Sequence, residues 1–408
     1  MAFDPMKERG IPLDRQVRSW RELAGEPYDK ASVHPYTRCR VIAMNGIEVD
    51  AILHSHQWAR HTGDLDLKRQ LAAIRRVEQQ QQKAISGLIP GEETILENTI
   101  GYEQVAVDLT AWIAQQEPDP YAKQAYEFGL LEDFDHLYRY ANLLDLLEKK
   151  RAEEIVGHYT EIIPGRPTPM EHRHPHDDVR IALDHRSADP LSLLHALTVT
   201  AAEQQTMNYY MNVGNRPTNP IARALYLEIA MIEEQHVTHY ESLLDPTMSW
   251  AAMEAAHQYN ECYLYYSFMQ QEEHPRIKEI WETHLAMELE HLRLACELVK
   301  QIDARDPAEF LPQEIPEPVL FQSNKEYVRQ VLASQVNLTA NLADFVPMDE
   351  LPEDHRYHQY QRAVHAGGFI PSEAVIQEHK KAMSGQEYRL NTEGPHPVEW
   401  LRRSQAAE

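Results

Sequence analysis

Cysteine is scarce in this chain of 408 residues. The three cysteines, Cys39, Cys262 and Cys296, are isolated from one another, and their number is odd. Isolated cysteines in odd number argue against a disulfide framework, a CxxC zinc site or an iron–sulfur ligand set. We therefore assign no metal or redox chemistry to cysteine.

Basic clusters and long apolar runs are also missing. The chain has 39 Lys and Arg against 64 Asp and Glu, a formal net charge of −25, which argues against nucleic acid or an anionic membrane as a partner. The first residues, MAFDPMKERGIPLDRQ, lack the apolar core of a signal peptide, and no stretch has membrane-spanning length. We therefore expect a protein of the reducing cytoplasm.

Glycine is rare too, with 15 residues, whereas long segments are rich in Ala, Leu, Glu and Gln. This composition predicts an all-α protein, and the length is ample for one large or two medium cores. We divide the chain into three parts. An irregular arm broken by prolines covers residues 1–43, a helical domain covers 44–302, and a partly helical extension with a polar tail covers 303–408.

Apolar periodicity and turn residues predict the positions of the helices. They cover residues 44–61, 64–87, 92–116, 121–158, 191–211, 219–243, 250–271, 275–302 and 324–342. A proline-rich crossover over 159–190 separates the fourth helix from the fifth and is long enough to run the length of a helix bundle. Its histidines, His172, His174, His176 and His185, are expected to face solvent.

The helix over 219–243 carries a carboxylate and an imidazole on its apolar stripe. Glu233 and His236 are three residues apart and point together into whatever the helix packs against, with Tyr240 one turn further on. The same spacing occurs 100 residues earlier. The counterparts there are Asp133, His136 and Tyr140. A buried carboxylate needs compensation, by a bound cation or by a hydrogen-bond network.

Two glutamates extend this repeat. Glu103 and Glu203 differ by 100 positions, and each lies 30 residues before the acidic member of the next pair. Glu103 lies 15 residues before Pro118 and Asp133 lies 15 after it, so both are expected at one height of an antiparallel helix pair. The candidate metal ligands are Glu103, Asp133, His136, Glu203, Glu233 and His236. Two divalent ions would neutralise the four carboxylates, and oxygen-rich ligands with one histidine per metal suit iron or manganese.

The order glutamate, acidic-x-x-His, long crossover, glutamate and Glu-x-x-His resembles the ferritin-like di-iron carboxylate superfamily. The resemblance covers residues 92–244, under half of the chain. It implies a ferritin-like four-helix bundle with a long crossover, flanked by additional helices as in the larger oxygenase and reductase members. It also implies two bound iron ions, or a manganese–iron pair, with Glu103 and Glu203 as single ligands beside the two acidic–histidine pairs. Asp133 departs from the usual Glu, so Glu132 or Asp135 is an alternative ligand.

A rival site uses the second half of the helical domain. It combines Glu203, Glu233 and His236 with a third Glu-x-x-His and one more glutamate. Those additional residues are Glu261, Glu288 and His291. Glu48 and Glu78, the latter followed three residues later by Gln81, resemble the ligand pattern with its histidine replaced. We interpret them as ordinary polar positions.

The function expected from these observations is a dinuclear metal oxidoreductase. It would activate dioxygen or peroxide, draw electrons from an external donor, and oxidise a small organic substrate. Tyr140 and Tyr240 are the candidate catalytic residues, because tyrosines near the ligands could relay electrons, although aromatic core packing also accounts for such residues. Two alternatives remain open, namely a peroxide- or iron-detoxifying ferritin-like protein and a non-catalytic helical scaffold subunit. We also expect a homo-oligomer, such as a homodimer.

Overall fold

The computed structural model describes residues 3–383, 389 and 394–404. These residues are mostly helical, and the sheet they contain has two short strands, so the all-α prediction is confirmed. The first two residues of the predicted arm and residues 384–388, 390–393 and 405–408 of the predicted polar tail lie outside the described residues. Within the described part, no helix is both long enough and apolar enough to span a bilayer.

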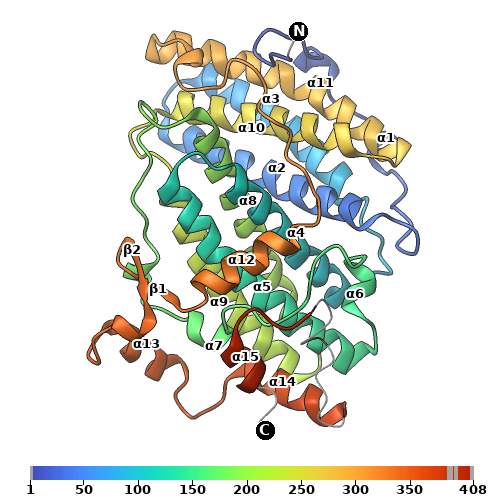
Figure 1. Cartoon of the computed structure of the whole chain (residues 1–408). Helices are drawn as coiled ribbons and strands as arrows, with labels where there is room; N and C mark the ends of the chain where they lie inside the picture. Colours follow the sequence, from blue (N-terminus) through green and yellow to red (C-terminus); the bar gives the residue numbers. More distant parts are fainter. Residues whose placement is uncertain (1–2, 384–388, 390–393, 405–408) are drawn as a thin grey trace.

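Eight long helices fall into two groups of four (Figure 1). We call the first the central group. It contains α4 (Ile95–Gln116), α5 (Pro120–Glu148), α8 (Pro190–Val213) and α9 (Pro220–Glu241). We call the second the outer group. It contains α2 (Pro35–His61), α3 (Leu65–Ser86), α10 (Trp250–Gln271) and α11 (Pro275–Leu298).

Both groups are built from antiparallel helix pairs. In the central group α4 packs on α5 and α8 on α9, and the pairs meet through α4 with α8 and α5 with α9. In the outer group α2 packs on α3 and α10 on α11, and α2 contacts α10. Short turns join the members of each pair, which makes them antiparallel. The groups meet where α2 packs against α4 and α8 and where α10 packs against α8, and a continuous apolar core fills this junction.

Three helix starts in the central group, those of α5, α8 and α9, are fixed by the same local chemistry. Asp119, Asp189 and Asn219 each cap a helix by accepting hydrogen bonds from backbone N–H groups, and a proline follows each of them at the first helical position. Proline suits this position because it has no N–H to leave unsatisfied and its φ is already helical. The residue at which each helix begins is therefore well defined, and with it the height of every side chain along the helix.

Two predicted helix boundaries are wrong for local reasons. The helix predicted from residue 44 begins at Pro35, where the side chain of His34 accepts a hydrogen bond from the N–H of Tyr36, so the irregular arm is shorter than residues 1–43. Pro35 occupies the first turn, where proline does not break a helix. The helix predicted to reach residue 158 ends at Glu148, because Lys149 adopts a left-handed conformation with φ 56°.

Short elements complete the fold. Before the outer group lie η1 (Leu13–Arg15) and α1 (Trp20–Leu23), and the crossover contains α6 (Ala152–Ile155), α7 (Thr168–Glu171) and η2 (Pro175–Asp177). A π-helical turn, η3 (Val299–Asp303), and then η4 (Pro307–Glu309) follow α11. The extension contains α12 (Lys325–Gln335), η5 (Met348–Glu350), α13 (Arg356–Val364), α14 (Pro371–Ala382) and α15 (Glu399–Ser404).

The C-terminal extension wraps the central group. α12 packs on α5, and α14 packs on both α5 and α9, so the side of the central group away from the outer group is covered (Figure 1). The helix predicted over 324–342 is partly wrong, because α12 ends at Gln335 and an antiparallel hairpin follows. Its strands are β1 (Leu338–Asn341) and β2 (Asp344–Pro347), with Leu338 opposite Pro347.

Candidate metal centre

The six residues predicted as metal ligands come together inside the central group. Glu103 projects from α4, Asp133 and His136 from α5, Glu203 from α8, and Glu233 and His236 from α9. Each is at most 1% exposed. Three of the acidic residues, Asp133, Glu203 and Glu233, each lie 13 residues after the proline that begins their helix, about 20 Å along the axis. The capping residue and proline that begin each of these three helices thus place the three carboxylates at a common height.

The ligand atoms form two overlapping sets. Glu103, Asp133, His136 and Glu233 form one set, and Asp133, Glu203, Glu233 and His236 form the other, with the four ligand atoms of each set within 4.8 Å of one another. Asp133 and Glu233 belong to both sets. Each set thus consists of the two shared carboxylates together with one glutamate and one histidine of its own. This arrangement is expected of a dinuclear centre with bridging carboxylates.

Glu233 lies between the two imidazoles. Its Oε1 is 3.1 Å from Nδ1 of His136, and its Oε2 is 3.1 Å from Nδ1 of His236. The two imidazole rings are 5.9 Å apart between centroids. Asp133 faces the same space, with Oδ1 at 3.2 Å from Nδ1 of His236 but without hydrogen-bond geometry. Both Nδ1 atoms therefore face the shared carboxylates.

Several buried carboxylate oxygens have no hydrogen-bond partner among the described residues. They are both oxygens of Asp133, both oxygens of Glu203 and Oε2 of Glu103. Burial, together with the neighbouring carboxylates, raises the pKa of Glu103 and of Glu203 well above the ordinary value for glutamate. Unpaired carboxylates inside a protein are costly unless a cation compensates them. The donor set therefore fits a pair of divalent metal ions.

A second layer of carboxylates holds the outer nitrogens of the imidazoles. Nε2 of His136 lies 2.8 Å from Oε2 of Glu171, and Nε2 of His236 lies 2.8 Å from Oε2 of Glu132. A carboxylate that accepts the Nε2 proton leaves the lone pair on Nδ1, the atom that faces the shared ligands. Such carboxylate–histidine pairs orient metal-binding histidines and raise their basicity.

The alternatives to Asp133 have other partners. Glu132 forms ion pairs with Arg166 and Arg173; burial alone would raise its pKa, but Arg173 and His236 hold that pKa well below the usual range. Asp135 accepts hydrogen bonds from Arg139 and from the crossover residue Thr168. Neither carboxylate reaches the two ligand sets, so the structure favours Asp133 as the ligand from this turn of α5.

The crossover delivers Glu171 by packing directly against α5. The N–H of Gly165 donates to Oδ1 of Asp135 at 3.0 Å, and a Cβ at this glycine would overlap the backbone of α5 at Leu131 and Asp135. Glycine is needed for this close approach. Three residues later the chain enters α7, whose last residue, Glu171, places its carboxylate on His136.

Tyrosines surround the two ligand sets. Tyr210 donates a hydrogen bond from its hydroxyl to Oε1 of Glu103. Tyr140 packs between Tyr210 and Tyr226, with centroid distances of 5.3 and 5.0 Å, and Tyr240 packs against His236 at 6.2 Å. The hydroxyls of Tyr140 and Tyr240 have no hydrogen-bond partner in the part of the chain that is described. The two predicted catalytic tyrosines thus flank the site, whereas Tyr210 contacts a ligand directly.

The rival six-residue arrangement is not assembled. Glu261, Glu288 and His291 lie in the outer group rather than beside Glu203, Glu233 and His236. Their neighbours there are Glu48 and Glu78, both fully buried, so the interpretation of these two glutamates as ordinary polar positions is wrong. The outer group therefore holds a second carboxylate–histidine cluster.

Two of the four crossover histidines do not face solvent. His172 and His185 are buried, with His172 beside Glu228 at 3.3 Å and His185 hydrogen-bonded to Asp245 at 2.5 Å. His174 is half-buried and His176 is exposed. The prediction of solvent-facing histidines is thus wrong for His172 and His185, because the crossover packs on α9 and does not lie free in solvent.

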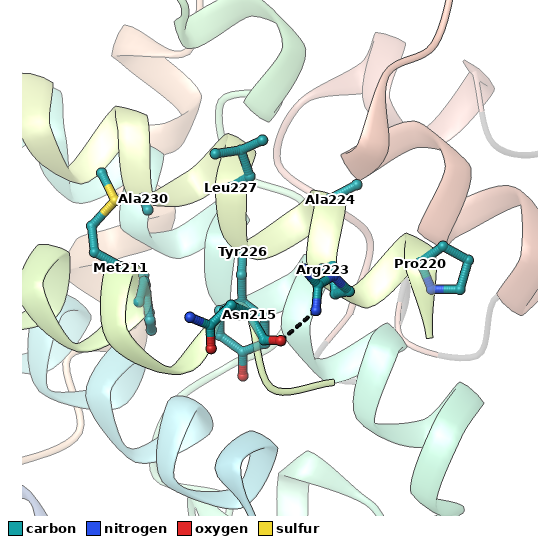
Figure 2. Close-up of a pocket in the computed structure, with 10 residues that line it drawn as sticks. Met211, Asn215, Pro220, Arg223, Ala224, Tyr226, Leu227 and Ala230 are labelled. Atoms are coloured by element: carbon teal, nitrogen blue, oxygen red, sulfur yellow. Dashed lines mark hydrogen bonds between the residues drawn. The ribbon is translucent and has the colours of Figure 1, made fainter. Parts of the chain in front are cut away.

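A surface cavity of about 370 Å³ adjoins the site at the turn between α8 and α9. Met211, Ala224 and Leu227 contribute apolar walls, and Arg223 donates a hydrogen bond to the carbonyl oxygen of Asn215 (Figure 2). Tyr210 also lines the cavity. Because its hydroxyl bonds Glu103, this one side chain connects the cavity to the ligand cluster.

Comparisons with known proteins add no identification: no family model matches the chain, and neither a curated protein nor a solved structure matches it. The case for the site therefore depends on its geometry. Sequence reasoning missed the roles of Glu171, Glu132 and Tyr210 as partners of the ligands. No periodicity marks the contact that Glu171 makes from the irregular crossover. Glu132 and Tyr210 lie on helices, but at positions that the 100-residue repeat does not pick out.

Proposed function

We propose that this chain is a dinuclear metal oxidoreductase, with two iron ions or a manganese–iron pair, that uses dioxygen or peroxide to oxidise a small organic substrate. The observation that carries the proposal is the sharing of Asp133 and Glu233 by two buried four-residue ligand sets. Ligand sets rich in oxygen with one imidazole each suit iron or manganese better than zinc or copper. Such a metal pair supplies two electrons and a place for an oxidant to bind.

The residues of the chain perform three tasks around this pair. Glu171 and Glu132 hold the Nε2 protons and so present both Nδ1 atoms to the metals. Tyr210 holds one oxygen of Glu103 and leaves the other free to act as a ligand. Burial of all six ligands excludes bulk water, which limits loss of oxidising equivalents in side reactions.

The cavity beside Tyr210 supports an organic substrate. Its volume of about 370 Å³ lies in the range of small-molecule sites, and its walls combine apolar side chains with the polar Arg223 and Asn215. Incorporation of one oxygen atom from dioxygen releases the other as water and requires two electrons and two protons, supplied by an external electron donor and solvent. With peroxide as oxidant, no donor is required.

The proposed compartment is a reducing cytoplasm. All three cysteines are free thiols and are buried, as is ordinary for a protein that never meets an oxidising environment. The proposal also includes self-association into a homo-oligomer, which sedimentation of the purified chain would test.

The first test is metal content combined with oxidant consumption. Metal-free protein is loaded anaerobically with Fe²⁺, freed of excess metal, and treated with hydrogen peroxide. Two Fe²⁺ ions and two protons reduce one peroxide to two waters. We expect a double variant, His136→Ala with His236→Ala, to hold two fewer iron ions per chain than wild type and to lose this rapid consumption.

A matched control separates loss of ligands from loss of a buried histidine. His195 on α8 is equally buried and pairs with Glu117 at 2.8 Å, away from both ligand sets, so His195→Ala should keep the full metal content. Equal metal content in wild type and in the double variant would overturn the dinuclear proposal. Sustained peroxide turnover by the loaded protein, unchanged when Ala224→Trp fills the cavity, would instead favour detoxification without an organic substrate.

A further inference from the structure

The outer group repeats the ligand pattern of the central group. Glu48 lies on α2, Glu78 on α3, Glu261 on α10, and Glu288 with His291 on α11. All five side chains are fully buried. We call these five residues the outer cluster. Each helix pair thus contributes a single glutamate from its first helix and an acidic residue from its second, as in the central group.

The helix register supports this equivalence. Glu48 lies 13 residues after Pro35, Glu288 lies 13 after Pro275, and Glu78 lies 13 after the first residue of α3. The same distance separates Asp133, Glu203 and Glu233 from their helix starts. Six helices therefore place a carboxylate at one height above their first residue. An arrangement of ordinary polar residues has no reason to share this register or to be fully buried.

The strongest sign of a missing partner is Glu261. Neither of its carboxylate oxygens has a hydrogen-bond partner within the described ranges, and its side chain faces Glu288, Glu48 and Glu78. One oxygen each of Glu48 and Glu78 is likewise unpartnered. Tyr265 donates to the other oxygen of Glu48, and Gln258 donates to the other oxygen of Glu78 at 2.9 Å. The positive groups near the cluster are Arg18, Arg75 and His291.

The imidazole of His291 is oriented as the two central imidazoles are. Its Nε2 lies 2.7 Å from Oε1 of Gln16, whose own amide nitrogen donates to the backbone oxygens of Ile11 and Met287. Those two bonds fix the amide so that its oxygen accepts from Nε2 of His291. The lone pair then sits on Nδ1, 2.9 Å from Oε2 of Glu288. Two acceptors at that distance need a proton or a metal ion between them.

We propose that the outer cluster binds one divalent cation of the Mn²⁺ or Fe²⁺ class, held by Glu78, Glu288 and His291. The ligand atoms of these three residues lie within 4.8 Å of one another, and the free carboxylate of Glu261 provides a fourth ligand. A second ion in the outer cluster would lack a histidine ligand, because Gln81 occupies the position that corresponds to a ligand histidine in the central group. Nε2 of Gln81 donates to Oε1 of Glu288 at 2.5 Å, and an amide nitrogen does not bind a metal.

The test is the number of Mn²⁺ ions bound per chain, measured by elemental analysis after loading and desalting. Wild type is expected to hold three, the His136→Ala and His236→Ala double variant one, and His291→Ala two. Two ions in wild type that are both retained in His291→Ala would overturn the inference and leave the dinuclear proposal intact. One ion in wild type that is lost only in His291→Ala would support the inference while the dinuclear proposal fails.

Two further variants, Gln81→His with its control Gln104→His, and Glu261→Gln, keep the test decisive if His291→Ala does not fold. Gln81→His restores the missing imidazole and is expected to add an ion, whereas Gln104→His, at a buried glutamine bonded to Val156 and Thr160, should add none. Glu261→Gln removes an unpaired buried carboxylate. It should raise the melting temperature of the metal-free protein and reduce the rise on Mn²⁺ addition. An unchanged Mn²⁺-induced rise would contradict a ligand role for Glu261.

Discussion

Nε2 of His136 lies 2.8 Å from a carboxylate oxygen of Glu171, on the side of the ring away from Glu233. Burial alone would lower the pKa of His136, but Glu171 and then Glu233 raise that pKa well above the ordinary value. The same pair of contacts, with Glu132 in place of Glu171, surrounds His236. The centre is therefore symmetric in its orienting groups as well as in its ligands.

Glu171→Gln should weaken binding of one of the two metal ions. The amide cannot match the carboxylate as acceptor for the Nε2 proton, so Nδ1 of His136 becomes a poorer ligand. We expect about 10- to 100-fold weaker affinity for the ion held by Glu103 and His136, and little change for the other. Calorimetric titration of metal-free protein with Mn²⁺ resolves the weakened site from the sites that keep their affinity.

The control for this variant is Glu161→Gln. Glu161 is also buried and pairs with Arg329, remote from the ligand sets. The variant Glu161→Gln should lower the free energy of unfolding without altering the affinity for Mn²⁺. Equal affinities in wild type and Glu171→Gln would show that Glu171 supports the crossover and not the imidazole.

Tyr210→Phe should destabilise the protein through Glu103. The hydroxyl of Tyr210 donates a hydrogen bond to Glu103, and leaving a buried acceptor without its donor costs about 1–3 kcal/mol. Without it the buried carboxylate keeps no donor in the metal-free protein, whereas bound metal compensates. We expect a larger fall in melting temperature for the metal-free form than for the loaded form.

Tyr209→Phe is the adjacent control. Its hydroxyl donates to the backbone oxygen of Ile95 at 3.3 Å and does not contact a ligand. Its effect on melting temperature should be the same with and without metal. If Tyr210→Phe behaves in the same way, the hydroxyl is a packing contact and does not tune Glu103.

The clustering of the candidate ligands could be predicted because it depends on helical spacing. The offsets of 30 and 100 residues between Glu103, Asp133, Glu203 and Glu233 reflect equal distances within antiparallel pairs whose starts are fixed by caps and prolines. This regularity is visible in the sequence because each residue of a helix adds a fixed rise along the helix axis, so that residue number determines height. The all-α class followed from the composition, with few glycines and long segments rich in Ala, Leu, Glu and Gln.

The remaining features depend on contacts that spacing does not encode. Glu48 and Glu78 are polar in sequence, and only the packing of α10 and α11 over them makes them buried. Glu171 reaches His136 from an irregular crossover. The hairpin after α12 was missed because Leu338 lies seven residues after Val331, which also fits the helix predicted over 324–342, and its turn uses Leu342 with φ 54°, a conformation unusual for leucine.

Gly129→Ala should destabilise α5, against the usual trend. Replacing a mid-helix glycine by alanine normally stabilises by about 1 kcal/mol. Here a Cβ would overlap the hydroxyl oxygen of Tyr240, and overpacking of a core costs about 1–3 kcal/mol. We therefore expect a lower free energy of unfolding in urea.

The double variant Gly129→Ala with Tyr240→Phe tests the cause of that loss. Removing the hydroxyl opens the space that the new Cβ needs, so the double variant should recover most of the stability lost by Gly129→Ala alone. Additive losses in the two single variants would place the strain elsewhere on α5.

Asp108 should make folding stability depend on pH. Burial raises its pKa to about 7, against the hydrogen bonds from Thr160, Tyr36 and Asn324 and the charge of Lys325, which lower it. A raised folded-state pKa means that the stability contribution is complete below the unfolded pKa and is lost as the pH rises towards the folded pKa. The contribution should therefore fall between about pH 4 and pH 7, by up to roughly 4 kcal/mol.

Asp108→Asn removes this titration and keeps an oxygen that can accept from Thr160 and Tyr36. Wild type and variant are compared by urea unfolding at pH 5 and pH 8. The pH-dependent contributions of the two buried carboxylate–histidine clusters cancel in this comparison, because both proteins contain them. The variant should gain stability relative to wild type as the pH rises. A difference between the two proteins that stays constant across this range would mean that Asp108 remains charged, held by Lys325 and its hydrogen-bond donors in spite of its burial.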